Sequence, residues 1–165
     1  MTRTEAMIGS AAFFMIAPAS VAGVAPWLIT HWRFGADATA PVSIAGAALI
    51  AACLAMLVEC FLRFALKGHG TPAPVAPTQR LIADGLYAHV RNPMYIAVVG
   101  LIAGQALLFA SAALIAYAVA ASFAFMAFVL YYEEPRLRRE FPDDYPAYFA
   151  AVPRWIPRLT PWKGG

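Results

Sequence analysis

Residues 87–100 read YAHVRNPMYIAVVG, and within them the polar tripeptide Arg91-Asn92-Pro93 leads directly into an apolar run that continues to Tyr132. Two explanations fit a charged tripeptide at this position. Pro93 begins a membrane helix and Arg91 extends to the water beside it, or the tripeptide helps to hold a small polar ligand where the helix begins. Both explanations make Pro93 the start of a helix.

The chain as a whole is far more apolar than a soluble domain. Hydrophobic residues make up 62% of its 165 residues and charged residues only 13%, whereas soluble domains contain about 25% charged residues. The mean hydropathy is +0.66. Since about 20 apolar residues cross the hydrocarbon of a bilayer, four segments are candidate spans: Ala6–Ile29, Val42–Leu66, Met94–Ala110 and Ala112–Tyr132.

The last two of these segments follow each other without an obvious break. A single helix over both would be far longer than a bilayer is thick, so we predict a tight hairpin near Ser111. Pro18 and Pro26 lie inside or at the end of the first span, where they predict helix kinks. The predicted fold class is all-α: a polytopic membrane protein of one domain, with about four transmembrane helices.

Basic residues are unevenly distributed along this arrangement. Loops rich in Lys and Arg tend to stay in the cytoplasm, and ten of the twelve basic residues lie around the second connection or after the fourth span. We therefore predict a multi-pass integral membrane protein with both termini in the cytoplasm and a net charge of +3 that suits anionic lipid. No basic run is interleaved with aromatic residues, so no nucleic acid is expected as a partner.

The single domain divides into four parts: two N-terminal spans (1–67), a cytoplasmic connector (68–93), the helical hairpin (94–132) and a cytoplasmic C-terminal segment (133–165). A linker rich in Gly and Pro opens the connector at 68–79, and Gly85 is its expected turn residue. Aromatic and apolar residues of the C-terminal segment recur at helical spacing. They predict a short amphipathic element on the membrane or over the bundle: Leu137, Phe141, Tyr145, Tyr148 and Phe149.

Several kinds of site find no support in the sequence. Cys53 and Cys60 lie on similar faces of the second span, which is typical of buried free thiols. The three histidines are scattered and no CxxC pattern occurs, so no metal is expected. GxSxG, GxGxxG and Walker sequences do not occur either.

Glu59 and Arg63, four residues apart near the end of the second span, are placed to pair on one helix face.

The second half of the chain contains two motifs, one on each side of the predicted hairpin. GLYAHVRNPMY (85–95) precedes the hydrophobic hairpin, and EEPRLRREFPDDYPAYFAAVPRWIP (133–157) follows it. This order resembles the isoprenylcysteine carboxyl methyltransferase family and its phospholipid methyltransferase relatives, whose pattern is G-x-Y-x-x-x-R-H-P-x-Y, a hairpin, a Glu-Glu pair, F-x-x-x-Y-x-x-Y and a basic end. The resemblance covers residues 80–157. It implies a membrane methyltransferase that uses S-adenosyl-L-methionine and releases S-adenosyl-L-homocysteine.

The resemblance further implies a cytoplasmic cofactor pocket closed by the C-terminal segment. Glu133 or Glu134 would hold the cofactor ammonium, Arg91 would bind its carboxylate through two parallel bonds, and tyrosines would flank the adenine or sulfonium. Adjacent glutamates on a helix point about 100° apart, so only one is expected to face the cofactor. Arg91 and Glu134 are the expected catalytic residues. The expected cofactor-binding residues are Gly85, Leu86, Tyr87, Val90, Arg91, Asn92, Pro93, Tyr95, Glu133, Glu134 and Tyr148.

Asn92 departs from the family pattern, which has His at this position. Asparagine cannot carry a charge or act as a base near neutral pH. A carboxylate acceptor is already ionised at pH 7 and needs no base, whereas an amine must first lose a proton. This favours a carboxylate acceptor, that of an isoprenylated cysteine or a similar isoprenoid or lipid acid, and leaves a phospholipid amine open. Because a lipophilic acceptor is concentrated in the bilayer, we expect it to enter sideways between the helices.

Two alternatives remain open. A membrane reductase of the steroid 5-alpha-reductase type has a similar helical arrangement but takes NADPH, whose extra phosphate would require more Arg or Lys and would lie poorly beside the Glu-Glu pair. The other alternative is a non-catalytic membrane protein that retains the fold. Asn92, in place of the family His, is the feature that keeps it open.

Overall fold

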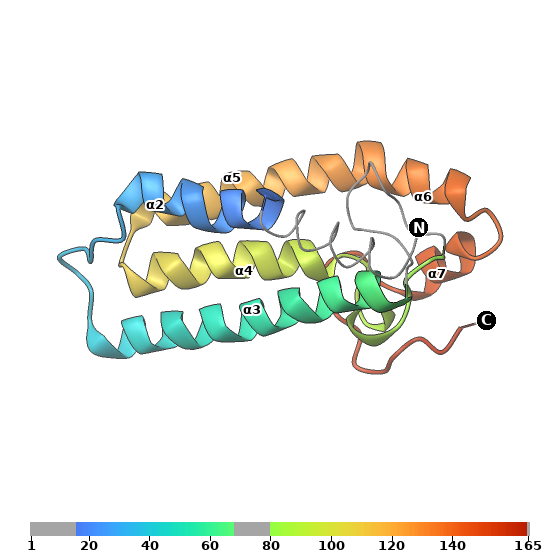
Figure 1. Cartoon of the computed structure of the whole chain (residues 1–165), viewed down its shortest axis with the longest axis horizontal. Coiled ribbons are helices and arrows are strands. Elements are labelled where there is room, and N and C mark those ends of the chain that lie inside the picture. Colours follow the sequence, from blue (N-terminus) through green and yellow to red (C-terminus); the bar gives the residue numbers. More distant parts are fainter. Residues whose placement is uncertain (1–15, 68–79, 165) are drawn as a thin grey trace. The chain divides into compact units, whose positions relative to one another are not determined.

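The structure is a computed structural model that describes residues 16–67 and 80–164 (Figure 1). Every regular element within these residues is a helix, which confirms the all-α class. Two predictions fall on other parts of the chain. Residues 6–15 of the first expected span and the linker 68–79 lie outside the described residues.

Helices occupy all four expected spans as far as these are described. α4 begins at Pro93, as predicted, and α5 continues through a π-helical turn, η3, into α6, so the fourth helix reaches Glu140 instead of ending near Tyr132. The described part of the first helix covers Ile16–Thr30. The elements are η1 (Ser20–Val24), α2 (Ala25–Thr30), α3 (Ala40–Lys67), η2 (Gly85–Ala88), α4 (Pro93–Leu108), α5 (Ala112–Phe128), η3 (Val129–Glu133), α6 (Glu134–Glu140) and α7 (Tyr145–Ala151).

Two of these helices are long and apolar enough to cross a membrane. They are α3, over Ala40–Phe64, and the continuous helix Ala112–Glu140. The described part of the first helix, Ile16–Thr30, and α4 are also apolar, and each covers fewer than the about 20 residues that a span requires. Four membrane crossings therefore stay a prediction, whereas the two long helices agree with an integral membrane protein.

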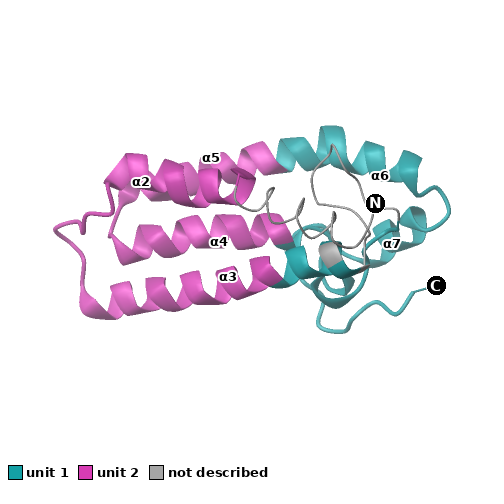
Figure 2. Ribbon diagram, in the orientation of Figure 1, with its two compact units in different colours: residues 1–13, 59–93, 126–165 teal, residues 14–58, 94–125 magenta. Residues whose placement is uncertain are grey.

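The chain forms two compact units (Figure 2). The helical unit consists of residues 14–58 and 94–125, and the C-terminal unit of residues 1–13, 59–93 and 126–165. Each unit contains a buried cluster of its own. Ala106, Phe109 and Leu114 form the cluster of the helical unit, and Tyr145, Tyr148 and Val152 that of the C-terminal unit.

The turn between α4 and α5 lies where the sequence predicts the hairpin. Ala110 has a left-handed backbone conformation (φ 51°), and the amide of Ser111 donates to the carbonyl of Ala106 at 2.9 Å. A left-handed residue followed by such a bond is a common way to end a helix. Phe109 and Leu114 pack together across the turn. The hairpin near Ser111 is therefore confirmed.

Small residues allow α3 and α4 to approach closely. A Cβ atom on Gly46 would lie 2.6 Å from the carbonyl oxygen of Gly104, and one on Gly100 would lie 2.3 Å from the sulfur of Cys53. Ser43 adds a hydrogen bond of 3.1 Å to the carbonyl of Leu108. Glycines at a helix contact and a serine bonded to a neighbouring backbone are typical of helix pairs in membranes.

Pro26 leaves carbonyls of the first helix without their usual donor. A proline has no amide hydrogen, so it cannot donate to Ala22, four residues earlier, or to Val21, five residues earlier in the π-helical pattern of η1. Two side chains supply donors instead. Gln105 Nε2 donates to the carbonyl of Ala22 at 2.7 Å, and Tyr117 Oη donates to that of Val21 at 2.9 Å. Because an unpaired carbonyl is costly in hydrocarbon, these bonds attach the first helix to α4 and α5 at its proline.

We expect Gln105→Leu to lower the free energy of unfolding by about 1 kcal/mol, because the carbonyl of Ala22 loses its donor. In a Pro26→Ala background the restored amide is one donor that the carbonyls of Ala22 and Val21 can share, so the same change should cost less. Thermal unfolding in detergent measures both effects. Ser122→Ala, which removes a hydroxyl bonded to the carbonyl of Ala118, is the control and should be nearly neutral. An equal cost with and without Pro26 would contradict the role given to Gln105.

Candidate active site

Gly85 allows Arg63 to approach the start of η2. The backbone of Gly85 is left-handed (φ 55°), which favours glycine, and a Cβ atom there would lie 1.9 Å from Arg63 Cζ and displace the guanidinium. Arg63 pairs with Glu59, as predicted, and its Nη1 lies 3.0 Å from Asp84 Oδ2. The expected turn at Gly85 is therefore confirmed, and the two ion pairs hold it in place.

Tyr87 and Tyr148 use their hydroxyls within the fold. Tyr87 shares a hydrogen bond with the thiol of Cys60, and Tyr148 donates to the backbone carbonyl of Tyr87 at 2.8 Å. Burial raises the pKa of both tyrosines well above the ordinary value, so both are neutral donors at physiological pH. A ligand beside them would therefore meet their rings rather than free hydroxyls.

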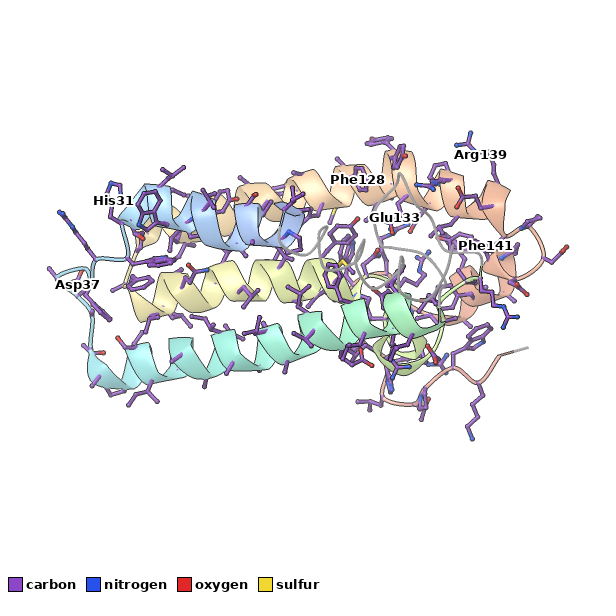
Figure 3. All side chains as sticks on the ribbon, in the orientation of Figure 1. His31, Asp37, Phe128, Glu133, Arg139 and Phe141 are labelled. Atoms are coloured by element: carbon purple, nitrogen blue, oxygen red, sulfur yellow. The ribbon has the colours of Figure 1, made fainter. Side chains whose placement is uncertain are left out.

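The C-terminal segment forms two short helices where the sequence predicts a single amphipathic element. α6 ends at Glu140, α7 begins at Tyr145, and an exposed turn over 142–144 separates them. Figure 3 labels Phe141 at the end of α6. The five residues with helical spacing nevertheless lie in one cluster, which also contains connector residues. The cluster therefore lies within the C-terminal unit and joins α6 and α7 to the connector.

Three charged side chains from distant parts of the sequence meet in the C-terminal unit. Glu134 is only 7% exposed. Its Oε1 accepts from Arg91 Nη1 at 3.0 Å and from Arg154 Nε at 2.7 Å, and its Oε2 accepts from Arg154 Nη2 at 3.0 Å. These bonds raise the pKa of Arg154, which stays cationic. Two positive charges and one negative charge leave this group able to take a further anion.

Arg91 is buried in an aromatic setting. Its Cζ lies 4.0 Å from the centroid of the Phe149 ring, and its Nη1 lies 3.5 Å from Tyr145 Oη. Within the described part of the chain, Arg91 Nε and the indole nitrogen of Trp155 are buried donors without an acceptor. Because a buried donor without an acceptor is costly, both nitrogens are suited to an acceptor atom of a ligand.

Glu133 is half-buried in the π-helical turn η3 and is labelled in Figure 3. Burial, followed by the charges of Glu134 and Glu133, raises the pKa of Tyr145, and Glu133 also contributes to the raised pKa of Tyr87 and Tyr148. Glu133 therefore lies near these tyrosines, whereas Glu134 is bound by two arginines. π-helical turns of this kind occur often at functional sites.

Residues 153–162, here called the C-terminal strap, are bound along the motif that contains Arg91. Asn92, which is 6% exposed, donates from Nδ2 to the carbonyl of Arg154 at 3.1 Å. The amide of Arg91 donates to the carbonyl of Pro153 at 2.9 Å, and the strap amides of Arg158 and Trp162 donate to the carbonyls of His89 and Ala88. The side chain at position 92 therefore has a structural partner in this chain.

The structure brings most of the expected site residues into one unit. All of them lie in the C-terminal unit except Tyr95, which belongs to the helical unit, where its ring centroid lies 4.9 Å from that of Phe125. Val90 is buried, and the carbonyl of Leu86 accepts from the amide of Val90. Pro93 begins α4 and is buried.

Sequence reasoning missed Arg154, Tyr145 and Phe149 as members of this group. Arg154 enters the sequence analysis only as one basic residue among ten, although the basic end of the family pattern is the signal that points to it. The predictions on Cys53 and Cys60 hold, since both are buried and free. Among the described residues, no group of three or more His, Cys, Asp or Glu could hold a metal ion.

We expect Glu134→Gln to lower the free energy of unfolding by about 3 kcal/mol, because it leaves the buried Arg91 without its counter-charge. Glu140→Gln on the same helix is the control. Glu140 pairs with Arg136 near the surface, and losing such a pair costs about 0.5 kcal/mol or less. Denaturation of the purified protein in detergent measures both values. Similar costs for the two changes would show that the buried group does not stabilise the unit.

Comparison with known families agrees with this geometry. Residues 42–144, more than half of the chain, match the phospholipid methyltransferase family. The match starts near the beginning of α3, where the sequence carries no recognisable motif, and includes the connector, the hairpin and the Glu-Glu pair. No curated protein and no solved structure matches the chain. The resemblance found in the sequence is confirmed: the chain belongs to the phospholipid methyltransferase family of membrane methyltransferases.

Proposed function

We propose that the protein is an S-adenosyl-L-methionine-dependent methyltransferase whose cofactor binds in the C-terminal unit beside Arg91, Glu134 and Arg154. The observation that carries this proposal is the buried pair of Arg91 and Glu134, joined by the partly exposed Arg154, in which Arg91 Nε still lacks an acceptor. The cofactor has a carboxylate, an ammonium, a sulfonium and an adenine. This unit offers a buried cationic donor, two carboxylates and aromatic rings, so the residues present fit the cofactor.

The proposed roles follow from these contacts. Arg91 binds the cofactor carboxylate, for which its Nε is the free donor. Glu134, together with Glu133 beside the tyrosines, provides negative charge for the ammonium. Tyr87 and Tyr148, whose hydroxyls are engaged within the fold, offer ring faces to the adenine or sulfonium. Gly85, Leu86, Val90 and Pro93 shape the connector, and Asn92 holds the strap.

S-adenosyl-L-methionine supplies an electrophilic methyl group. The chain's own contribution is to align the acceptor and to exclude water, which requires no covalent intermediate. Asn92 cannot take a proton and is bonded to the carbonyl of Arg154. This supports an acceptor that is ionised without help, so we propose O-methylation of a lipophilic carboxylate, that of an isoprenylated cysteine or a similar isoprenoid or lipid acid.

A phospholipid amine is a second candidate acceptor, and two observations favour it. One is the matched family, which is described as phospholipid methyltransferase. The other is His89, whose Nδ1 lies 2.8 Å from the carbonyl oxygen of Arg158. A carbonyl can only accept, so Nδ1 carries a hydrogen, and in the neutral imidazole Nε2 is the nitrogen with the lone pair. Membership of a methyltransferase family does not favour the reductase alternative.

In this proposal the protein is a single domain with four spans and both termini in the cytoplasm. The connector and the C-terminal segment then lie on the cytoplasmic side. A polar cofactor reaches the C-terminal unit from water on that side. The acceptor is apolar and concentrated in the bilayer, so it enters between the helices.

We expect S-adenosyl-L-homocysteine to bind the purified protein in detergent and NADPH not to bind. Arg91→Lys should weaken that binding about ten- to a hundredfold, since lysine lacks the planar fork of donors. Arg138→Lys is the matched control, because Arg138 also lies over Phe149, with Cζ at 4.4 Å, but is exposed and does not contact Glu134. Calorimetric titration measures affinity, and circular dichroism verifies folding. Equal affinities for the two variants would contradict the role of Arg91.

Transfer of a labelled methyl group to two acceptors tests the acceptor class. With a farnesylated cysteine derivative the rate should change little between about pH 6.5 and 9, because its carboxylate is ionised throughout. With phosphatidylethanolamine the rate should rise with pH and fall in His89→Gln, because the amine must lose a proton. Label in the cysteine derivative alone supports the carboxylate, and label in the phospholipid alone supports the amine. Label in neither contradicts both.

A further inference from the structure

Both oxygens of Glu134 are already occupied by arginine nitrogens. Oε1 accepts from Arg91 and Arg154, and Oε2 accepts from Arg154. A ligand ammonium that approaches this carboxylate must therefore compete with a guanidinium. The competition also concerns charge, because the ammonium places a further positive charge beside a carboxylate that two arginines already neutralise.

The two arginines differ in how readily they can leave. The Arg91 side chain is 8% exposed, lies against Phe149 and is near Tyr145. The Arg154 side chain is 30% exposed, so its guanidinium reaches water after a smaller rearrangement. Departure of Arg91 would place a desolvated cation among aromatic rings without a counter-charge, which is far less favourable. Arg154 is therefore the side chain that can leave Glu134 more readily.

We propose that Arg154 is an internal competitor of the cofactor ammonium: its guanidinium occupies Glu134 and is replaced there by the ammonium when the cofactor binds. This inference rests on the proposed function and adds a residue that acts against binding. Arg154 stabilises the folded protein by neutralising Glu134, and it lowers the affinity for the cofactor by the free energy of the bonds that must be broken.

The exchange involves the side chain and leaves the strap in place. The carbonyl of Arg154 accepts from Asn92 Nδ2, and the carbonyl of Pro153 accepts from the amide of Arg91. Neither bond includes the guanidinium, so both persist when it turns towards water. Asn92 thus acquires a function in this chain: it holds the backbone from which Arg154 reaches Glu134.

The direction in which the removal of Arg154 changes the cofactor affinity separates this proposal from a purely structural or carboxylate-binding role. If Arg154 helped to bind the cofactor carboxylate, or only kept the unit folded, its removal would weaken binding. If it competes with the ammonium, its removal strengthens binding. In both cases the protein without ligand becomes less stable, so stability and affinity must be measured on the same variants.

The experiment compares wild type, Arg154→Gln and Arg154→Lys in detergent, by titration with S-adenosyl-L-homocysteine and by thermal unfolding without ligand. We expect Arg154→Gln to bind about three- to thirtyfold more tightly while unfolding at a lower temperature. Arg154→Lys, which keeps the charge but loses the fork, should gain less. Arg158→Gln is the matched control. Its guanidinium lies on the same strap but bonds the carbonyl of Ala151, so its affinity should stay within about twofold of wild type.

A second titration uses an analogue of S-adenosyl-L-homocysteine without the amino group. This analogue has no ammonium to compete, so Arg154→Gln should not improve its binding. An affinity gain that is the same for both ligands, or unchanged or weaker binding of S-adenosyl-L-homocysteine by Arg154→Gln, overturns the proposal while leaving the proposed function intact. A wild-type protein that does not bind S-adenosyl-L-homocysteine overturns the proposed function itself.

Discussion

The C-terminal unit depends on one buried carboxylate held between two arginines. Glu134 lies at the start of α6, Arg91 just before α4 and Arg154 on the C-terminal strap. A carboxylate removed from water is stable only with such partners, and an arginine buried among aromatic rings needs a counter-charge as well. The ion pairs therefore stabilise the contact between these three segments of the C-terminal unit.

In the helical unit, buried polar groups also need partners, but these partners are uncharged. A proline in the first helix leaves the carbonyls of Ala22 and Val21 without their helical donor, and Gln105 and Tyr117 donate to them. Close approach of α3 and α4 at Gly46 and Gly104 provides the remaining association. In surroundings where water does not satisfy polar groups, such local bonds and close packing attach one helix to another.

Family membership and geometry support different parts of the functional argument. The family match reaches from residue 42 to residue 144 and assigns the class of reaction. Arg154 and the strap lie beyond the matched residues, yet Arg154 forms two hydrogen bonds with Glu134, and the carbonyl of the same residue accepts from Asn92. The proposed exchange at Glu134 and the structural role of Asn92 therefore rest on the geometry of this chain and not on the family match.

The sequence by itself determined the features that depend on local patterns. Apolar runs located the helices, and Pro93 marked the start of α4. The break near Ser111 followed because one helix over both segments would be longer than a bilayer is thick. The Glu59–Arg63 pair and the turn at Gly85 also depend on residues close in sequence. The order of the two motifs pointed to the family. Each of these features depends on residues close together in the sequence or on the thickness of the bilayer, and both can be read from the sequence.

Only the tertiary structure decided how residues far apart in sequence pair. No local pattern shows that Glu134 binds Arg154 rather than Arg138, its neighbour at helical spacing, or that Asn92 binds the backbone of the strap. The C-terminal aromatic residues predicted a single element, whereas the turn at 142–144 divides it into α6 and α7 and still leaves the five residues in one cluster. Pairing between distant charges depends on which segments are brought together and on how deeply they are buried, because burial makes an unpaired charge costly. The pattern of residues along the sequence shows neither the contact between distant segments nor their depth of burial.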